Sequence, residues 1–446
     1  MAKKAAQTMV ASERNDGQPA PARALKPPPR RLRVVVFTMV FPNRRQPLHG
    51  TFVLERARHL AALADIEVVA PVPWYRSLGH QGRSPDVTPI LAVSHPRFWY
   101  VPRVLGAVRG FCLFLSTVGE IGRLRRRFDF DLIDAHFAYP DGFAAVLLGR
   151  WFRRPVCITL RGTIVQWSRR PVGRRLCDWA LRRAERVIAV SHNLAERARQ
   201  GGVPENRVAT IANGVDSNRF QLLDRIAARA RLGLPEDERL LVSVGHISPR
   251  KGFQRVIRSL SRLDSIIPGA RLAIVGGSGA EEDNSAQLRA LVQQLGLTDR
   301  VLFVGAQVPD RVALWLGAAD VFVLASDFEG CPNVVLEAMA CGRPVVATKV
   351  GDIERMVPPF AGILVADPED EVALSDSIAA ALTRNWDTHR IRDHVAVQSW
   401  GGVAERVAAQ WRLAVDTPGA KGADTAGGPA AFTQDLVTAA ARSFDP

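Results

Sequence analysis

Two glutamates, eight positions apart, flank a stretch of sequence that favours the start of a helix. Glu329 and Gly330 come before Pro332, which suits a first helical position because the N–H it lacks would have no partner there. The backbone N–H groups between Gly330 and Asn333 should then point out of a helix N-terminus, which attracts anions. Glu337 lies one helical turn after Asn333, on the same face. Two carboxylates would repel a phosphate, so we expect them to accept hydrogen bonds from sugar hydroxyls. The alternative is a turn residue and a solvated helix residue.

A basic loop follows the apolar run Leu240–Val244 and carries His246, Arg250 and Lys251 towards the next helical pattern. Lysine binds phosphate as a compact charge, and arginine binds it in a bidentate manner. A diphosphate leaving group needs this positive charge as its bond breaks. We therefore expect the loop to hold phosphates; basic residues on a solvated loop are the alternative.

Gly276 and Gly277 form a third turn directly after an apolar run, Leu272–Val275. The turn is not a dinucleotide-binding fingerprint, because Glu282 stands where that motif needs its third glycine. We expect these glycines to let the backbone approach a nucleotide.

The first half of the chain places further polar residues after expected strands. Gly50 and Thr51 open a helix, and Gly50 would allow the close approach of an acceptor or a phosphate, although an ordinary loop fits equally well. His136 ends one strand, and Arg161 follows the next. A lone histidine is usually structural, but its place at the carboxyl end of a strand favours a role in a cleft.

No pattern in the sequence indicates a metal site. Asp129 and Asp131 resemble a metal-binding carboxylate pair, yet they precede their strand and so lie at the wrong end of it. The cysteines form no CxxC pair and have no histidine at metal spacing, so we expect buried, reduced thiols in a cytosolic protein. They are Cys112, Cys157, Cys177, Cys331 and Cys341.

Short β-branched runs alternate with helical patterns along the whole chain. In the first half we expect strands at Leu32–Phe37, Ile66–Ala70, Leu132–His136, Val156–Leu160, Val187–Val190 and Val208–Ile211, and helices at Phe52–Leu63 and Gly142–Trp151. In the second half we expect strands at Leu240–Val244, Leu272–Val275, Val301–Val304, Val321–Leu324 and Val345–Ala347. Helices are expected there at Phe253–Leu263, Ala286–Leu295, Arg311–Leu316, Asn333–Cys341, Glu371–Leu382 and Trp400–Leu413. Continuous apolar strands with helical crossovers indicate parallel sheets that are covered on both faces.

These two series predict an α/β fold of two Rossmann-like, doubly wound domains that face each other across a cleft. The break falls at Phe220–Pro235, where a polar helix ends at Gly233. We expect a disordered arm over 1–31, domains over 32–220 and 221–395, a crossover helix over 396–415 that returns to the first domain, and a flexible tail over 416–446. Hinges are expected near Val215–Phe220 and around Asn385–Trp400.

The net charge of +15 calls for an acidic partner, and three classes fit: nucleic acid, an anionic membrane surface and a phosphorylated substrate. No zinc pattern, RNP-like strand or helix-turn-helix signal accompanies the charge, so we expect no nucleic acid. Val101–Leu115, with Arg103 and Arg109, fits either a helix on anionic lipid or an ordinary helix that covers the first sheet. The chain shows neither an apolar signal segment nor a run long enough to span a bilayer. We therefore expect a cytoplasmic protein, for which contact with the inner membrane face is one alternative.

The ordered set of motifs resembles family 4 of the nucleotide-sugar glycosyltransferases, a retaining family with the GT-B fold, over about residues 33–411. Within that family, it is most similar to enzymes of cell-surface polysaccharide assembly. The motifs are Phe41-Pro42, His49-Gly-Thr-Phe-Val53, Asp131-Leu-Ile-Asp-Ala-His136, Gly202-Val-Pro-Glu-Asn-Arg-Val208, Asn213-Gly-Val-Asp216, Phe220, Pro249-Arg-Lys-Gly252 and the two glutamates separated by seven residues.

The resemblance implies a role for each matching residue. Glu329 matches the glutamate that contacts the donor sugar, Glu337 the one that binds the ribose hydroxyls, and Lys251 the pyrophosphate lysine. His136 matches a cleft histidine near the donor sugar, and Glu354 matches a donor-side acid. The expected catalytic residues are Glu329, His136 and Lys251; donor-binding residues are His246, Arg250, Gly276, Gly277, Gly330, Cys331, Pro332, Asn333, Glu337 and Glu354; acceptor-side residues are Gly50, Thr51 and Arg161.

The sequence departs from the family at two positions. Arginine is usual where His246 stands, and an acid is frequent where Ile164 stands, so one phosphate contact and the acceptor-side chemistry differ here. The resemblance implies front-face transfer from a UDP- or GDP-sugar to a saccharide or lipid-linked saccharide, with no metal and no cofactor. A sugar-nucleotide epimerase and a non-catalytic binding homologue are alternatives. A phosphorylase would need a pyridoxal cofactor, and no lysine environment suits one.

Overall fold

The computed structural model describes residues 30–76, 91–100, 108–168, 170–277 and 283–417. The expected arm over 1–31 and tail over 416–446 fall almost entirely outside these residues, as do Arg103 and Glu282. Each sheet of the fold is parallel throughout.

The first sheet has seven strands in the order β4-β2-β1-β6-β7-β8-β9. Its strands are β1 (Arg33–Phe37), β2 (Asp65–Val69), β4 (Ala92–Ser94), β6 (Leu132–His136), β7 (Val156–Leu160), β8 (Arg186–Ala189) and β9 (Val208–Thr210). Two short strands, β3 (Val72–Pro73) and β5 (Arg97–Phe98), continue the chain beyond β2 and β4 and form a separate parallel pair.

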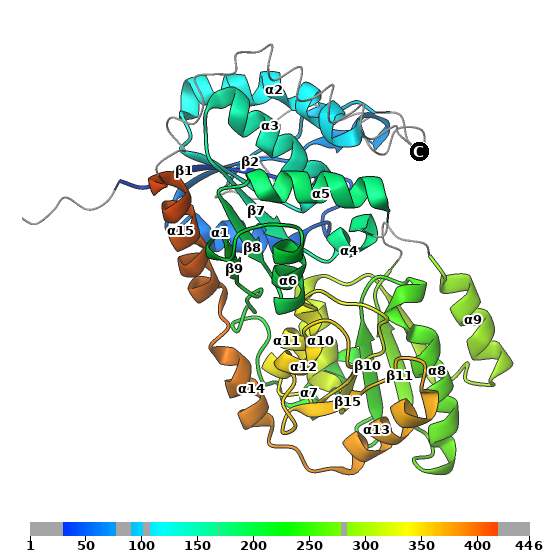
Figure 1. Ribbon diagram of the computed structural model, residues 1–446. Coiled ribbons are helices and arrows are strands. Elements are labelled where there is room, and N and C mark those ends of the chain that lie inside the picture. The colour runs from blue at the N-terminus through cyan, green and yellow to red at the C-terminus, as the bar shows by residue number, and fades with distance from the viewer. Residues whose placement is uncertain (1–29, 77–90, 101–107, 169, 278–282, 418–446) are drawn as a thin grey trace, which may run out of the picture. The chain divides into compact units, whose positions relative to one another are not determined.

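Helices cover both faces of this sheet because neighbouring side chains of each strand point to opposite sides. Val35 and Phe37 pack under α2 (Arg109–Phe128), α3 (Phe143–Phe152) and α5 (Pro171–Arg183), whereas Val34 and Val36 pack under α1 (Thr51–Leu60) and α15 (Trp400–Asp416). Figure 1 shows α2 and α3 on one side of β1 and β2, and α1 and α15 on the other. The short helices α4 (Thr163–Ser168) and α6 (His192–Gln200) follow β7 and β8.

The second sheet has six strands in the order β12-β11-β10-β13-β14-β15. They are β10 (Leu240–Val244), β11 (Arg271–Val275), β12 (Val301–Gly305), β13 (Val321–Leu324), β14 (Val345–Thr348) and β15 (Gly362–Val365). One face packs under α8 (Phe253–Arg262), α9 (Ser285–Gln294) and α13 (Glu371–Thr383). The other packs under α7 (Arg225–Leu232), α10 (Pro309–Ala318), α11 (Asn333–Ala340) and α14 (Thr388–Ala396), and α12 (Ile353–Met356) follows β14.

The last helix, α15, packs on the first sheet, where Trp411 is completely buried. The two segments that join the sheets touch each other: the Val215 N–H donates to the Gln398 carbonyl at 2.9 Å. In Figure 1 the chain can be followed from α13 through α14 and back to the first sheet along α15.

The predicted fold class is confirmed: two doubly wound parallel sheets, with every expected strand present within about one residue of its predicted bounds. The prediction missed β4 and β15, because three or four residues, one of them a glycine in β15, give no periodic signal. Of the two readings of Val101–Leu115, the described part supports the ordinary helix. That helix, α2, begins only at Arg109 and buries Leu113, Phe114 and Ile121 in the core.

Candidate functional site

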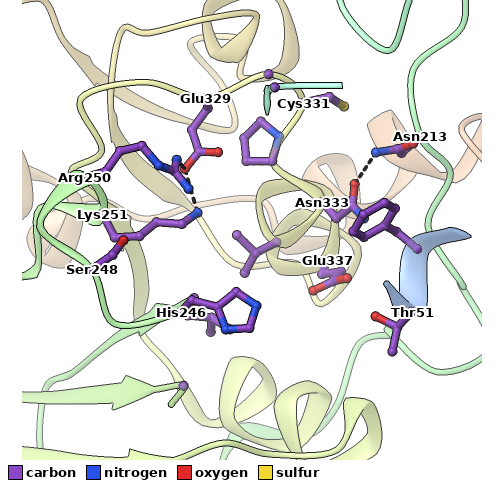
Figure 2. Close-up of a pocket in the computed structure, with 18 of the residues that line it drawn as sticks. Thr51, Asn213, His246, Ser248, Arg250, Lys251, Glu329, Cys331, Asn333 and Glu337 are labelled. Atoms are coloured by element: carbon purple, nitrogen blue, oxygen red, sulfur yellow. Dashed lines mark hydrogen bonds and ion pairs between the residues drawn. The ribbon is translucent and has the colours of Figure 1, made fainter. Parts of the chain in front are cut away.

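A cavity of about 810 Å³ lies at the carboxyl ends of the strands of both sheets. Nucleotide and cofactor sites occupy this place in doubly wound folds, and the volume falls in the range of ligand pockets. Figure 2 shows side chains from both halves of the chain around it. The described residues that line it include Leu48, Thr51, Phe52, Phe137, Arg161, Asn213, His246, Ser248, Arg250, Lys251, Gly276, Gly277, Glu329, Gly330, Cys331, Pro332, Asn333 and Glu337.

One wall of the pocket is formed by the second half of the chain, and an ion pair between Lys251 and Glu329 lies in this wall. The Lys251 ammonium donates to Oε1 of Glu329 at 2.7 Å, and the Ser326 hydroxyl donates to the same oxygen at 2.8 Å. No donor among the described residues reaches Oε2 of Glu329. The buried carboxylate is therefore held by one oxygen and leaves the other for a ligand hydroxyl.

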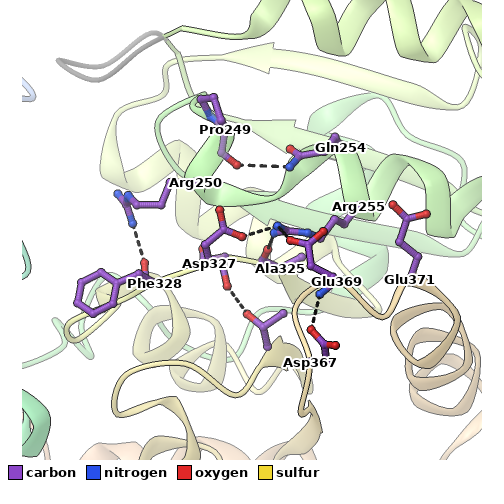
Figure 3. Close-up of polar contacts among 12 residues, drawn as sticks. Pro249, Arg250, Gln254, Arg255, Ala325, Asp327, Phe328, Asp367, Glu369 and Glu371 are labelled. Atoms are coloured by element: carbon purple, nitrogen blue, oxygen red, sulfur yellow. Dashed lines mark hydrogen bonds and ion pairs between the residues drawn. The ribbon is translucent and has the colours of Figure 1, made fainter. Parts of the chain in front are cut away.

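The loop that carries Glu329 is anchored from beneath by Arg255, which is almost fully buried on α8. Its guanidinium donates to the Ala325 carbonyl at 2.8 Å and pairs with Asp327 and with Glu369 (Figure 3). Arg250 reaches the same loop from the side and donates to the Phe328 carbonyl at 2.8 Å. These charge-assisted bonds hold the loop in place before any ligand arrives.

Gly252 lets the basic loop approach the Glu329 loop. Its φ of +67° is left-handed, and a Cβ there would lie 1.8 Å from the Ala325 carbonyl oxygen. No other residue fits this position, because a side chain would push apart the two loops that bring Lys251 to Glu329.

The N-terminus of α11 opens into the pocket. The helix begins at Asn333, as predicted, but Pro332 takes the N-cap position rather than the first helical position, and no side chain caps the helix. Its first N–H groups therefore remain available to an anion. Burial raises the pKa of the adjacent Cys331 thiol to about 11, so this cysteine is a neutral part of the wall.

Glu337 projects from α11 towards the space between His246 and Thr51 (Figure 2). Among the described residues, none donates a hydrogen bond to its carboxylate. Burial raises the pKa of Glu337 to about 7, and Arg219 opposes this shift only in part. An acidic side chain without a protein partner in a ligand-sized pocket is suited to accept hydroxyl groups.

His246 is exposed and lines the pocket. The predicted glycine turn lines the pocket and also has a structural role. The Gly276 N–H already donates to the Gly305 carbonyl at 2.9 Å, and a Cβ on Gly276 would lie 1.8 Å from the Gly245 carbonyl oxygen. Gly276 is thus required by the packing of two adjacent strand ends.

Arg161 forms the opposite wall and is 5% exposed. Its guanidinium lies over the Phe52 ring, 4.4 Å from the centroid, and donates to Oδ1 of Asn213 at 3.0 Å. The Asn213 amide donates in turn to Oδ1 of Asn333 at 2.7 Å. Burial, with nearby Arg56, lowers the pKa of Arg161 to about 9. One asparagine therefore joins the first-half wall to the start of α11.

His136 lies beneath this wall, 1% exposed, and does not line the pocket. Its Nδ1 is 3.4 Å from Nε of Arg161, and its Nε2 is 3.7 Å from the Asp134 carboxylate. Burial, with Arg56 and Arg161, holds the pKa of His136 well below its usual value. The imidazole is therefore neutral, and its proton belongs on Nε2 because Nδ1 faces a donor.

Two further predicted residues do not line the pocket. Gly50 caps α1 with a φ of +76°, and a Cβ there would meet the Val40 carbonyl. Glu354 is 60% exposed on α12 and pairs with Lys349 at 2.7 Å. Ile164 is buried in the first core. Gly50 was predicted from its place after the first strand and Glu354 from the resemblance alone, and neither argument could tell which side chains turn inwards.

Asn213 was not singled out from the sequence, although it follows β9 and lies in the Asn-Gly-Val-Asp motif. Its place after a strand was the available signal. Phe52, Phe137 and Ser248 also line the pocket and carry no chemical pattern of their own.

Within the described part of the chain, no three His, Cys, Asp or Glu side chains gather at metal-binding distance. Asp129 pairs with Arg154 at 2.7 Å, and Asp131 accepts the Arg33 N–H at 2.8 Å. Both carboxylates therefore have structural partners at the amino end of the first sheet.

Two family models match the chain in succession. The description "Glycosyltransferase Family 4" matches residues 49–219, and "Glycosyl transferases group 1" matches residues 224–395. The chain is 31% identical over 365 residues to the putative teichuronic acid biosynthesis glycosyltransferase TuaC of Bacillus subtilis, covering 78% of this chain and 88% of that protein. It is 29% identical over 333 residues to D-inositol 3-phosphate glycosyltransferase of Acidothermus cellulolyticus, covering 68% and 72%.

Solved structures show the same fold. Sucrose-phosphate synthase from Thermosynechococcus elongatus superposes with a TM-score of 0.70 at 22% identity, over 86% of this chain and 98% of that one. Anabaena HepE, in complex with UDP and glucose, superposes with a TM-score of 0.64 at 20% identity, over 86% and 100%.

Proposed function

Since this chain belongs to glycosyltransferase family 4, we propose that it transfers a sugar from a nucleoside diphosphate sugar to a saccharide or lipid-linked saccharide, with retention of anomeric configuration. The observation that supports this most directly is the pairing of two kinds of group in one pocket. Glu337 offers an unpartnered carboxylate to ribose hydroxyls, while Lys251, Arg250 and the α11 N-terminus offer positive charge to a diphosphate.

The reaction places negative charge on the diphosphate as its bond to the anomeric carbon breaks. In this proposal, Lys251, Arg250 and the first N–H groups of α11 stabilise the leaving group, and the contacts that already hold the two basic side chains limit their rearrangement. Glu329 uses Oε1 to hold Lys251 and Oε2 to accept a hydroxyl of the donor sugar.

Retention follows in this proposal from attack on the face that the diphosphate leaves. The acceptor hydroxyl gives its proton to a phosphate oxygen, forms the new bond to the anomeric carbon, and the diphosphate departs with the electron pair. The protein contributes position and charge rather than a nucleophile. Neutral His136 supports Arg161 from beneath, and Arg161 with Phe52 forms the wall on the acceptor side.

The chain acts in polysaccharide or glycoconjugate synthesis. This role is supported by relatives named for teichuronic acid, inositol phosphate and N-acetylglucosaminyl malate synthesis. For this chain we propose only the chemical class of each substrate. The donor nucleotide is UDP or GDP, the transferred sugar is a hexose, and the acceptor is a saccharide.

Membrane contact is a separate part of the proposal. Exposed arginines gather where α2 and α3 end, next to the amino ends of β6 and β7, and an ion pair between Arg154 and Asp129 joins these ends. These arginines are Arg123, Arg126, Arg150 and Arg153. Trp151, which is 56% exposed, stands at the end of α3, directly after Arg150. A basic surface with an exposed tryptophan suits an anionic lipid surface. In the described part of the chain, none of the helices combines the length and apolar character that crossing a bilayer requires.

Thermal unfolding with a panel of UDP-, GDP- and ADP-sugars tests the donor site, with slow donor hydrolysis as a second readout. A ligand at 100 times its Kd stabilises the native state by about 2.7 kcal/mol. One nucleotide sugar should stabilise the wild type but not Glu337→Ala. The control variant Glu205→Ala changes an exposed glutamate outside the pocket and should be stabilised like the wild type. No stabilisation of the wild type by any of them would contradict the proposal.

A further inference from the structure

The dipeptide Trp-Tyr occurs twice, as Trp74-Tyr75 and as Trp99-Tyr100, directly after β3 and β5. These two strands are paired in parallel, so continuing their register by one residue sets tryptophan beside tryptophan and tyrosine beside tyrosine. The structure has this arrangement. The indole rings of Trp74 and Trp99 stack with centroids 5.5 Å apart and planes 10° apart, and the two tyrosine hydroxyls are 2.8 Å apart.

The tryptophan pair is exposed but held firmly. Trp74 is 37% exposed and Trp99 is 57% exposed. The Trp74 indole N–H donates to the Tyr100 carbonyl at 3.1 Å, and the Trp99 backbone N–H donates to the Ser116 hydroxyl at 3.2 Å. Arg109 covers the Tyr100 ring, 4.8 Å from its centroid. A preformed aromatic surface loses little conformational entropy when a ligand covers it.

The pair lies at the same edge of the first sheet as the pocket. Trp74 comes after the carboxyl end of β2, and Trp99 comes after the carboxyl end of β4. In the sheet, β2 lies next to β1, and β4 lies next to β2. The pocket residue Thr51 comes after β1. Strands lie about 4.8 Å apart and rise about 3.3 Å per residue, so the tryptophans are displaced from the end of β1 by roughly 5–10 Å across the sheet. They also lie up to about 16 Å further along the strand direction, because each stands five residues beyond Val69 or Ser94. An oligosaccharide can bridge that distance.

We propose that Trp74 and Trp99 form a distal acceptor subsite that binds one sugar ring of a saccharide chain whose end lies in the pocket. The inference rests on the proposed transfer to a saccharide. The C–H face of a pyranose ring is apolar and packs against an indole face, while its hydroxyl rim stays in water.

A lipid surface fits this pair less well. Among the described residues, exposed arginines 123, 126, 150 and 153 gather at the opposite, amino edge of the sheet. The surface with the charge for anionic lipid is therefore around Trp151 rather than around the stacked pair. Trp151 is also a matched control, since it is a tryptophan with 56% exposure at the other edge.

Saturation-transfer NMR on the full chain can test the subsite with four probes: maltohexaose, mannohexaose, the N-acetylglucosamine hexamer and hexagalacturonate. At least one should bind the wild type. Trp99→Ala should weaken that binding roughly tenfold, because it removes one aromatic stacking surface. Trp99→Phe should keep most of the affinity, and Trp151→Ala should keep all of it.

Each other outcome overturns the subsite. Binding of no hexasaccharide by the wild type, or equal binding by Trp99→Ala, means that the pair holds no sugar. Loss of binding to phosphatidylglycerol vesicles in Trp99→Ala, with saccharide binding unchanged, means that the pair faces lipid. Stabilisation by a nucleotide sugar is measured on the same samples. This measurement tests the proposed transferase independently of the subsite, because neither Trp74 nor Trp99 lines the donor pocket.

Discussion

Nucleotide-sugar binding should weaken as the pH falls below about 7, because only the ionised carboxylate of Glu337 can accept hydroxyl hydrogen bonds with both of its oxygens. Burial raises the pKa of Glu337 to about 7 in the ligand-free protein. Arg219 lowers this pKa only in part, since the guanidinium also pairs with other carboxylates: Glu55, Asp216 and Asp310. Hydroxyl donors favour the charged carboxylate, so binding should lower the pKa.

The size of the effect follows from proton linkage. Between the two pKa values the free protein holds more protons than the complex, so acidification favours the free protein. If binding returns the pKa of Glu337 to its ordinary 4.5, the affinity at pH 5.5 should be about 30-fold lower than at pH 8. A smaller pKa change on binding would give a proportionally smaller loss.

Isothermal titration of the wild type and of Glu337→Gln across this pH range measures the effect. The variant should bind more weakly at pH 8 and should lose the acid-side fall. Both proteins are also compared in a His246→Gln background, so that the contribution of this pocket residue is separated from that of Glu337. An equal pH slope in the two proteins would refute the assignment of Glu337 to the ribose hydroxyls.

Lys251→Ala and Glu329→Ala should each lower turnover at saturating donor by roughly 10²–10³-fold, because each removes a preorganised electrostatic contact; wild-type turnover in both variants would overturn the site. Turnover should be unchanged in EDTA, and activity that returns only with a divalent cation would contradict this. Arg229→Ala should lower the free energy of unfolding by about 3 kcal/mol, since the guanidinium is fully buried and pairs with Asp320 at 2.7 Å. Exposed Arg231→Ala, on the same helix, should change it by less than about 0.5 kcal/mol. Equal urea midpoints for these two variants would contradict the buried-pair argument.

Much of the candidate site could be predicted because it sits at strand ends, and strand ends are local features of a sequence. Lys251, Glu329 and Glu337 were predicted from their loops and neighbouring helices, and the structure brings all three to one pocket. His136 was predicted with the same logic but is buried beneath the wall, and Glu354, predicted only from the resemblance, points to solvent. A strand end fixes where the backbone is, whereas the direction of a side chain depends on what packs against it.

The polar contacts that tie the site together could not be predicted, because they join segments far apart in the chain. The amide of Asn213 meets Asn333 across 120 positions, and Asp352 accepts the backbone N–H groups of His192 and Asn193 across 160 and 159 positions. Composition and periodicity carry no information on such pairs, since either partner alone is an ordinary polar residue.

The sequence by itself determined two parallel sheets, their helices and the residue types that stand at their carboxyl ends, because alternation of apolar runs and helical periods is encoded locally. Only the tertiary structure decided which of those residues face one cavity and what their charges become there. The raised pKa of Glu337, the neutral state of His136 and the stacking of Trp74 on Trp99 all follow from burial or register between distant segments. Such effects exist only once the chain has packed, because desolvation and contact are properties of neighbours in space.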